Sequence, residues 1–348
     1  MEEKLIALGL YLKEKGSFKY LKLIENEKIL EDYLTKNKLK VQTLMKLAED
    51  EIERANRLNI KVLFIKEKDF PEELKAIPYP PPFLYIKGSL CNLPKISLIG
   101  SRKPTSYGKE VASHFTKELA LAGVCPVSGL ARGIDTIVHK SCVNLNKPTL
   151  AILGSGLDII YPPENKKLSE EIVDKGGAVI SEFPLGSKPK KENFPRRNRL
   201  ISGISLGLII IEAGEKSGTL ITAKWAQEQG KDVFAIPGNI FSEQSKGTHL
   251  LLKEGAIPVT HPREVLEYLE LNIPSTPLLE SKKQELPLSP DERKILEVLS
   301  SYPISLEELA QKTELPISKL LTILTELEVK NLILSLPGKF YQLNPLFQ

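Results

Sequence analysis

The chain has 348 residues, of which 41% are hydrophobic and 26% charged, and its formal net charge is +4. This length suits two or three domains with real cores and excludes a single small domain. The mild positive charge excludes a histone-like basic tail protein, so any site for a polyanion has to be local.

The spacing of the cysteines and the length of the apolar runs indicate the compartment in which the chain is expected. Cys91, Cys125 and Cys142 are widely spaced and form no Cys-x-x-Cys pair. This pattern argues against a disulfide framework and against a zinc cluster. The N-terminal sequence lacks a basic stretch followed by a long apolar run, and no apolar stretch reaches about 18 residues. We therefore expect a cytoplasmic protein with no membrane partner.

The N-terminal part of the chain reads as helical. Residues 1–65 carry apolar side chains at helical spacing and are expected to form a small, SAM-like helical domain. The stretch that follows contains four prolines between residues 78 and 82 and cannot be helical. We interpret it as an ordered crossover into the next domain.

Within residues 66–270 the spacing of the apolar residues changes, and the new pattern predicts an α/β domain. Short apolar runs at 95–100, 123–129, 148–154, 177–182, 206–213, 232–238 and 256–260 alternate with helical patterns. This alternation is typical of an extended Rossmann-like, doubly wound parallel sheet. Such sheets bind ligands beyond the carboxyl ends of their strands. The loops after these strands are therefore the expected place for function.

The C-terminal part predicts a linker and a second module. Residues 271–288 are polar, proline-bearing and aperiodic, as in linkers, and residues 289–348 resemble a winged helix with a hairpin turning at Pro337-Gly338. Its second helix offers Lys319 and Lys330 against Glu326 and Glu328. A helix that reads the major groove needs a basic exposed face, so protein contact or weak DNA contact is favoured over duplex recognition.

Three strand-end loops carry groups that suit phosphates. The first has Gly100, Ser101 and Arg102, where a glycine turn, amide groups and a forked guanidinium meet a helix N-terminus. The other two contribute Ser128, Gly129 and Arg132, and Lys166 with Lys167. Asp135 is interpreted as a helix cap. Ile159 replaces the third glycine of a dinucleotide fingerprint in the third loop, so no nucleotide cofactor is expected.

The stretch "ENFPRRNRLISG", residues 192–203, is the most basic of the strand-end segments. We interpret it as a loop that holds an anion, together with the preceding lysines and with the Ser-Gly-Thr turn that starts a later helix. Its candidate residues are Lys190, Phe194, Arg196, Arg197, Asn198 and Arg199, and those of the turn are Ser217, Gly218 and Thr219. Arginines on several loops of one sheet edge suit a polymer, and a phenylalanine beside them suits stacked, unpaired bases. The sequence therefore predicts a site for single-stranded nucleic acid.

Catalytic motifs are missing from the sequence. It contains no P-loop, no His-Glu-x-x-His and no acidic cluster for two-metal chemistry. The buried-strand carboxylate Glu212 is expected to order Ser217 or the arginine segment, and His139 is expected to be structural. We predict neither a catalytic residue nor a metal or other cofactor, and hence no enzyme.

Six ordered blocks between about Pro78 and Tyr268 resemble the DNA-processing protein A family, called DprA or Smf. They include "GSRKPTSYG", "SGLARGIDTIVHK", "SEFPLGSKPKKENFPRRNRLISGIS" and "EAGEKSGTLITAKWAQEQGKDVFAIPGN". The resemblance implies a homodimer that binds and protects single-stranded DNA during natural transformation. It also implies loading of the RecA recombinase, often past single-strand-binding protein. In the family, the Gly-Ser-Arg turn contributes to the DNA pocket, which corresponds to residues 100–102.

Two alternatives stay open at this point. The core distantly resembles nucleotide-cleaving phosphoribohydrolases, but Thr222 and Ala223 stand where their Gly-Thr loop ends in a glutamate. The winged helix also allows a transcription regulator. The first alternative predicts release of free base from nucleotides, and the second predicts that binding depends on the C-terminal module.

Overall fold

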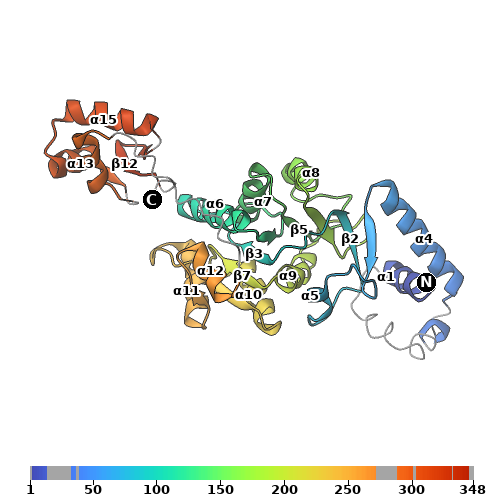
Figure 1. Cartoon of the computed structure of the whole chain (residues 1–348). Coiled ribbons are helices and arrows are strands. Elements are labelled where there is room, and N and C mark those ends of the chain that lie inside the picture. The colour runs from blue at the N-terminus through green and yellow to red at the C-terminus, as the bar shows by residue number, and fades with distance from the viewer. Residues whose placement is uncertain are drawn as a thin grey trace. The chain divides into compact units, whose positions relative to one another are not determined.

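The structure is a computed structural model that describes residues 2–13, 33–36, 39–271, 288–300, 303–330 and 332–344. The chain divides into two compact units, 1–274 and 275–348 (Figure 1). The N-terminal helices belong to the first unit together with the α/β core, so a domain boundary at residue 65 stays a prediction. The linker expected at 271–288 lies almost entirely outside the described residues.

A nine-stranded sheet forms the centre of the first unit within the described residues. Its order is β1 (Lys61–Phe64), β2 (Phe83–Gly88), β6 (Ala178–Ser181), β5 (Leu150–Leu153), β4 (Cys125–Ser128), β3 (Lys95–Ile99), β7 (Gly207–Ile210), β8 (Asp232–Ala235), β9 (Ile257–Pro258). Strands β3 to β9 are parallel, and each falls in one of the seven apolar runs expected to be strands. The predicted fold class is confirmed.

The first two strands correct the interpretation of residues 61–94. Strand β1 lies within residues 1–65, which we expected to be helical. Strand β2 pairs antiparallel with both β1 and β6 and so extends the sheet, where we expected only a crossover. The prolines stop just before the strand, at Pro82, whose carbonyl accepts a hydrogen bond from Ile65 N–H. Proline is tolerated at the start of a strand. The apolar run after it is buried from Phe83 to Ile86, so it has no polar alternation to distinguish a strand from a packed connection.

Helices cover both faces of the sheet (Figure 1). One face carries α6 (Ser106–Leu121), α7 (Ile134–Asn144) and α8 (Lys166–Asp174), which connect the strands from β3 to β6. The other face carries α5 (Glu72–Lys75), α9 (Asn193–Gly203), α10 (Gly218–Glu228) and α11 (Lys246–Lys253). Helix α12 (Pro262–Tyr268) is the last helix of the unit. The chain order therefore reverses between β3 and β7. Within the part of the chain that is described, no helix is both long and apolar enough to cross a bilayer.

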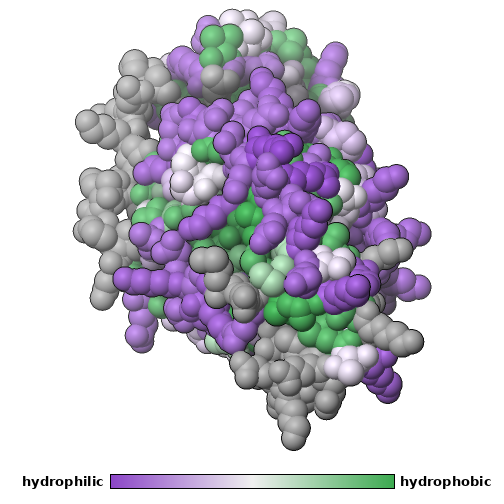
Figure 2. All heavy atoms as spheres, turned by 90° about the vertical axis from the view of Figure 1, so that its right-hand side faces the viewer, coloured by the Kyte–Doolittle hydropathy of each residue, from purple (hydrophilic) through white to green (hydrophobic). Residues whose placement is uncertain are grey.

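The N-terminal helices pack on each other and on the sheet. Helix α1 (Glu2–Lys13) contacts α4 (Val41–Arg57), and apolar residues of both join a core cluster with β2 and β6. Helix α4 buries Leu44, Ala48, Glu51 and Ala55, which recur at the spacing of one helix face. The surface seen from the side of these helices is mostly hydrophilic, with smaller apolar areas between the polar ones (Figure 2).

The second unit is a winged helix, as expected. It contains α13 (Pro290–Val298), β10 (Ile304–Ser305), α14 (Leu306–Thr313), α15 (Ile317–Val329), β11 (Ile333–Leu336) and β12 (Phe340–Leu343). Strands β11 and β12 form the hairpin that turns after Leu336. Lys319 of α15 pairs with Asp291 at 2.5 Å. Lys330, directly after α15, pairs with Glu292 at 2.6 Å. These carboxylates reduce the positive charge that α15 can offer to a duplex.

His139 makes the stability of the core depend on pH. Its ring is buried in α7, with Nδ1 3.0 Å from the Thr149 hydroxyl oxygen, and burial lowers its pKa to about 3. An unfolded histidine takes up a proton near pH 6.5. Between these values only the unfolded state is protonated, so the stability contributed by the neutral ring is lost as pH falls.

We expect His139→Leu to weaken this dependence. Between pH 6 and 4, the unfolding free energy of the variant should fall less steeply than that of the wild type, by about 1.4 kcal/mol per pH unit. Urea unfolding at a series of pH values measures both slopes. Equal slopes would show that the folded state accommodates the protonated ring.

Candidate functional site

An open cleft of about 870 Å³ lies at the carboxyl edge of the sheet. It is beyond β3 and β7, the two strands between which the chain order reverses, and this is where doubly wound sheets bind ligands. Loops after β3, β4, β5, β6, β7 and β8 contribute to the lining, together with helices α9 and α10. The predicted residues among the lining are Gly100, Ser101, Arg102, Phe194, Arg197, Asn198, Ser217, Gly218 and Thr219.

The cleft carries an excess of positive charge. Arg102, Lys103, Lys191 and Lys216 line it with exposed side chains, and none has an ion-pair partner among the described residues. The one carboxylate of the described lining, Asp135, is buried and accepts hydrogen bonds from the N–H groups of Gly129 and Ala131 at 3.1 and 3.3 Å. It therefore orders a loop, where we expected a helix cap, and it leaves the four cations without a counterion.

Backbone groups add to this field. Helix α10 begins at the cleft, and Ser217 caps it by accepting a hydrogen bond from Thr219 N–H at 3.2 Å. The positive end of the helix dipole thus faces the same space as the lysines. The neighbouring loops are held together by Ile134 N–H, which donates to the Ser101 carbonyl at 3.1 Å. This contact needs Gly133, because a Cβ at its φ of +77° would lie 2.3 Å from that carbonyl oxygen.

The arginine-rich segment is a helix, and this corrects our interpretation of it as a loop. Within α9, Phe194, Asn198 and Ile201 line the cleft. They are separated by four and then three residues, so they lie on one face of the helix. Arg196 and Arg199 are three residues apart and share a different face. The helix therefore separates side chains that the sequence places side by side.

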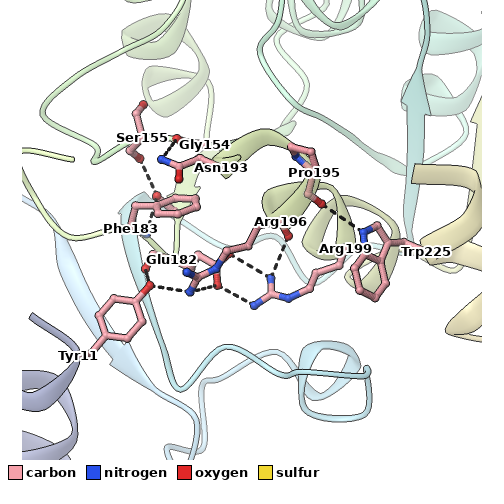
Figure 3. A network of polar contacts seen from close by, with 11 residues as sticks. Tyr11, Gly154, Ser155, Glu182, Phe183, Asn193, Pro195, Arg196, Arg199 and Trp225 are labelled. Atoms are coloured by element: carbon pink, nitrogen blue, oxygen red, sulfur yellow. Dashed lines mark hydrogen bonds and ion pairs between the residues drawn. The ribbon is translucent and has the colours of Figure 1, made fainter. Parts of the chain in front are cut away.

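Arg196 and Arg199 bind Glu182 and do not line the cleft (Figure 3). The Arg196 Nε atom is 3.1 Å from Glu182 Oε1, and the Arg199 Nη2 atom is 2.6 Å from Glu182 Oε2. The Glu182 and Arg199 side chains are only 1% exposed. A guanidinium this deeply buried cannot reach a ligand in the cleft. Both arginines were expected at the ligand site, and the acidic partner at the end of β6 is the reason that they are not.

Arg197 lies beneath the floor of the cleft. Its side chain donates to the carbonyls of Gly129, at 2.8 Å, and Ile152, and to Asn198 Oδ1 at 3.1 Å. Burial lowers its pKa to about 10, opposed by the nearby Asp135 carboxylate, so the guanidinium stays charged at neutral pH. A Cβ at Gly129 would lie 2.7 Å from its Nη1 atom. Gly129 therefore provides the space that this fixed charge needs.

Two aromatic rings line a narrower recess beside the cleft. The rings of Tyr161 and Phe194 lie 5.8 Å apart, centre to centre. The Arg102 guanidinium is 5.4 Å from the centre of the Phe194 ring, and that of Arg132 is 6.0 Å from the Tyr161 ring. Such distances are typical of cation–π contacts. The site thus presents flat apolar rings next to exposed cations.

Five more predicted residues lie outside the cleft lining. The buried Ser128 hydroxyl donates to the Leu98 carbonyl at 2.7 Å, because the residue still belongs to β4. Lys166, Lys167 and Lys190 are exposed, and Lys167 lies 3.5 Å from Glu171. Arg132 lines the recess and is paired with Glu164 at 2.5 Å.

Four charged or aromatic lining residues, Lys103, Tyr161, Lys191 and Lys216, were not among the candidate site residues, and one partner was misassigned. The three lysines each neighbour a candidate residue, and Lys191 is one of the lysines noted before the arginine segment. Tyr161 lies in the loop after β5, so the signal for all four was their position in strand-end loops. Glu212 was expected to order Ser217 or the arginine segment, but its carboxylate accepts hydrogen bonds from the N–H and hydroxyl of Thr105 at 2.9 and 2.5 Å. In the described chain, no cluster of three or more His, Cys, Asp or Glu side chains is placed to hold a metal.

We expect Glu182→Gln to destabilise the fold strongly. The variant keeps the size of the side chain but leaves Arg196 and Arg199 without the carboxylate, and an uncompensated buried charge costs about 3–5 kcal/mol. Urea unfolding measures the loss. The control is Glu164→Gln, which removes an exposed ion pair and should leave stability nearly unchanged. Equal, small effects of both changes would mean that the buried pair is not required.

A known protein family matches this chain over the whole length of the α/β core. The model described as DNA recombination-mediator protein A matches residues 61–270, and the DprA winged helix domain matches residues 280–339. Protein Smf from Escherichia coli is 38% identical over 282 residues, 79% of this chain and 75% of its own length. DNA processing protein DprA from Bacillus subtilis is 41% identical over 221 residues, 62% of this chain and 74% of its own length.

Two solved structures are also similar. The X-ray structure of DprA from Streptococcus pneumoniae has a TM-score of 0.58 and 36% identity, and the match covers 66% of this chain and 82% of that chain. DNA processing protein A from Helicobacter pylori has a TM-score of 0.55 and 32% identity, with 61% of this chain and 95% of that chain covered. The latter structure is described as giving insights into a unique single-stranded DNA binding mode. These matches confirm the resemblance stated from the sequence.

Proposed function

The chain belongs to the DNA recombination-mediator protein A family, and on that premise we propose that its cleft binds single-stranded DNA. The observation that carries the proposal is a set of four exposed cations around one cleft, none of which has an ion-pair partner in the described part of the chain: Arg102, Lys103, Lys191 and Lys216. Phosphates of a strand would replace the missing counterions. The Helicobacter pylori relative, described as binding single-stranded DNA, supports the same ligand.

The aromatic rings favour an unpaired strand over a duplex. Phe194 and Tyr161 lie beside the cations, and ring stacking stabilises an unpaired base by about 1–3 kcal/mol. Bases in a duplex are already stacked on one another and hide their faces. The cations Arg102, Lys191 and Lys216 come from three separate segments, which suits a chain of phosphates. In this assignment Arg197 supplies a fixed charge below the strand and no direct contact.

We also propose the biological role that family membership implies. The chain acts in the cytoplasm as a homodimer that protects incoming strands during natural transformation and loads the RecA recombinase past single-strand-binding protein. The winged helix is assigned to protein contact. Its lysines Lys319 and Lys330 are paired with carboxylates, whereas Ile317 and Leu321 are exposed one turn apart on α15.

The proposed role requires no chemical step at the cleft. The two buried carboxylates beside it are already engaged, Asp135 by two backbone amides and Glu212 by Thr105. A general base must be within reach of the proton that it removes. Both groups instead fix the loops that form the cleft, which supports binding over the nucleotide-cleaving alternative.

We expect Arg102→Ala to weaken binding of oligothymidine. Removal of a charge-assisted hydrogen bond should cost about 1.5–3 kcal/mol, or about tenfold to a hundredfold in Kd. Fluorescence anisotropy at several salt concentrations measures Kd, and log affinity should fall by about 0.7 per contacted phosphate for each unit of log salt. The control is Arg263→Ala on α12, whose arginine is exposed and paired with Glu267. Equal affinity of both variants would place the strand elsewhere.

We expect a chain that ends at residue 274 to retain strand binding. Residues 1–274 form a compact unit of their own and contain every residue of the cleft lining. Anisotropy with the same oligonucleotide should give a Kd within about threefold of the full chain, since tenfold corresponds to 1.4 kcal/mol. Complete loss of binding would favour the alternative in which the winged helix is the nucleic-acid reader.

A further inference from the structure

We propose that the N-terminal helices are positioning elements of the cleft, because they hold the segment that carries Lys191, one of the lysines of its lining. The segment comprises residues 182–191, between β6 and α9, and is called the lysine strap below. Lys188, Lys190 and Lys191 extend from it, all exposed and without an ion-pair partner among the described residues. The proposal rests on the proposed function, because it assigns this segment to single-strand binding.

Helix α1 holds the start of the lysine strap. The buried Tyr11 hydroxyl donates to the Glu182 carbonyl at 3.1 Å and accepts a hydrogen bond from Arg196 Nη2 at 2.8 Å (Figure 3). The Tyr11 ring also lies 5.7 Å from the Arg196 guanidinium. One side chain of α1 thus contacts the strap at its first residue and α9 just beyond its end.

Helix α4 holds the middle of the lysine strap. Glu51 is buried, and its Oε1 atom accepts hydrogen bonds from Leu185 N–H at 2.8 Å and from the Tyr85 hydroxyl at 3.0 Å. Arg54, one turn further along α4, pairs with Asp158 at 2.7 Å, and Asp158 accepts from Gly186 N–H at 2.8 Å. Two successive amides of the strap are therefore fixed by α4, directly or through Asp158.

The rest of the lysine strap leads from these anchors to the cleft. The Ser187 carbonyl accepts from Gly156 N–H at 2.9 Å, and Asn193 Nδ2 donates to the Gly154 carbonyl at 3.0 Å. Between these hydrogen bonds, Pro189 and Lys191 reach the cleft lining. Release of the anchors at Leu185 and Gly186 would therefore leave the lysines positioned only by these remaining hydrogen bonds, while the other cations stay in place.

The opposite wall of the cleft provides a matched reference. Lys216 also lines the cleft, but it follows β7 and precedes α10, and the contacts of Glu51 and Arg54 are with the strap, β2 and the loop after β5. A positioning role for α4 predicts coupling of its residues with Lys191 and none with Lys216. A general loss of stability would affect both lysines alike.

The experiment is a set of four double-mutant cycles on the full chain, with oligothymidine affinity as the readout. Glu51→Leu and Arg54→Ala are each combined with Lys191→Ala and with Lys216→Ala. Arg57→Ala is the control on the same helix, because Arg57 pairs with Glu53 of α4 and with no other carboxylate of the described residues. Glu51→Gln keeps an acceptor oxygen for Leu185 N–H and should restore most of the affinity that Glu51→Leu removes. Thermal unfolding of each variant identifies any that do not fold; Arg54 is half exposed, so Arg54→Ala provides the test if Glu51→Leu fails.

We expect Glu51→Leu and Arg54→Ala to weaken binding by about threefold to tenfold, the size of one ordinary polar interaction. The salt slope should become shallower by about 0.7 for each phosphate that the lysines no longer bind. Lys191→Ala should then add little, whereas Lys216→Ala should keep its full effect. Additive effects of both lysines, or wild-type affinity and salt slope in both α4 variants, would overturn the positioning role. Absence of binding by the wild-type chain would instead overturn the proposed function.

Discussion

The geometry of the cleft depends on one buried carboxylate. Glu182 directly follows β6 and binds both Arg196 and Arg199, so α9 cannot turn these guanidiniums toward the cleft without leaving a buried charge unpaired. The helical spacing then fixes the rest of α9. With Arg196 and Arg199 directed to Glu182, Phe194 and Asn198 have to face the cleft. The carboxylate thus orients an aromatic ring that it does not contact.

The sequence predicted the sheet and the edge at which the site lies. Buried parallel strands appear as short apolar runs, and their carboxyl ends meet at one edge, so the turns at Gly100 and Ser217 could be placed together before the structure was known. Strand β2 was missed because it is equally apolar on both faces and follows a run of prolines. Its position depends on packing against α1 and α4, which local periodicity does not record.

The roles of the individual arginines could not be predicted. Arg196, Arg197 and Arg199 are nearly adjacent and have the same side chain, so only their partners distinguish them. Those partners are distant in sequence: Glu182 precedes Arg199 by 17 residues, and Gly129 precedes Arg197 by 68. A basic cluster in a sequence therefore indicates that anions are nearby, but the anion can be a carboxylate of the same chain. Here Arg196 and Arg199 have that partner, and the unpaired cations are their less conspicuous neighbours.

The cations at the cleft divide into fixed and adaptable charges. Arg197 is held by backbone carbonyls beneath the floor and stays protonated, so its field is constant and is screened less by salt than that of an exposed group. Lys191 and Lys216 are exposed on flexible stems and can follow phosphates at different positions. A strand of any sequence has to be held along its backbone while its bases vary. The fixed charge of Arg197, the aromatic rings and the mobile charges of Lys191 and Lys216 on separate loops together meet that requirement without base-specific contacts.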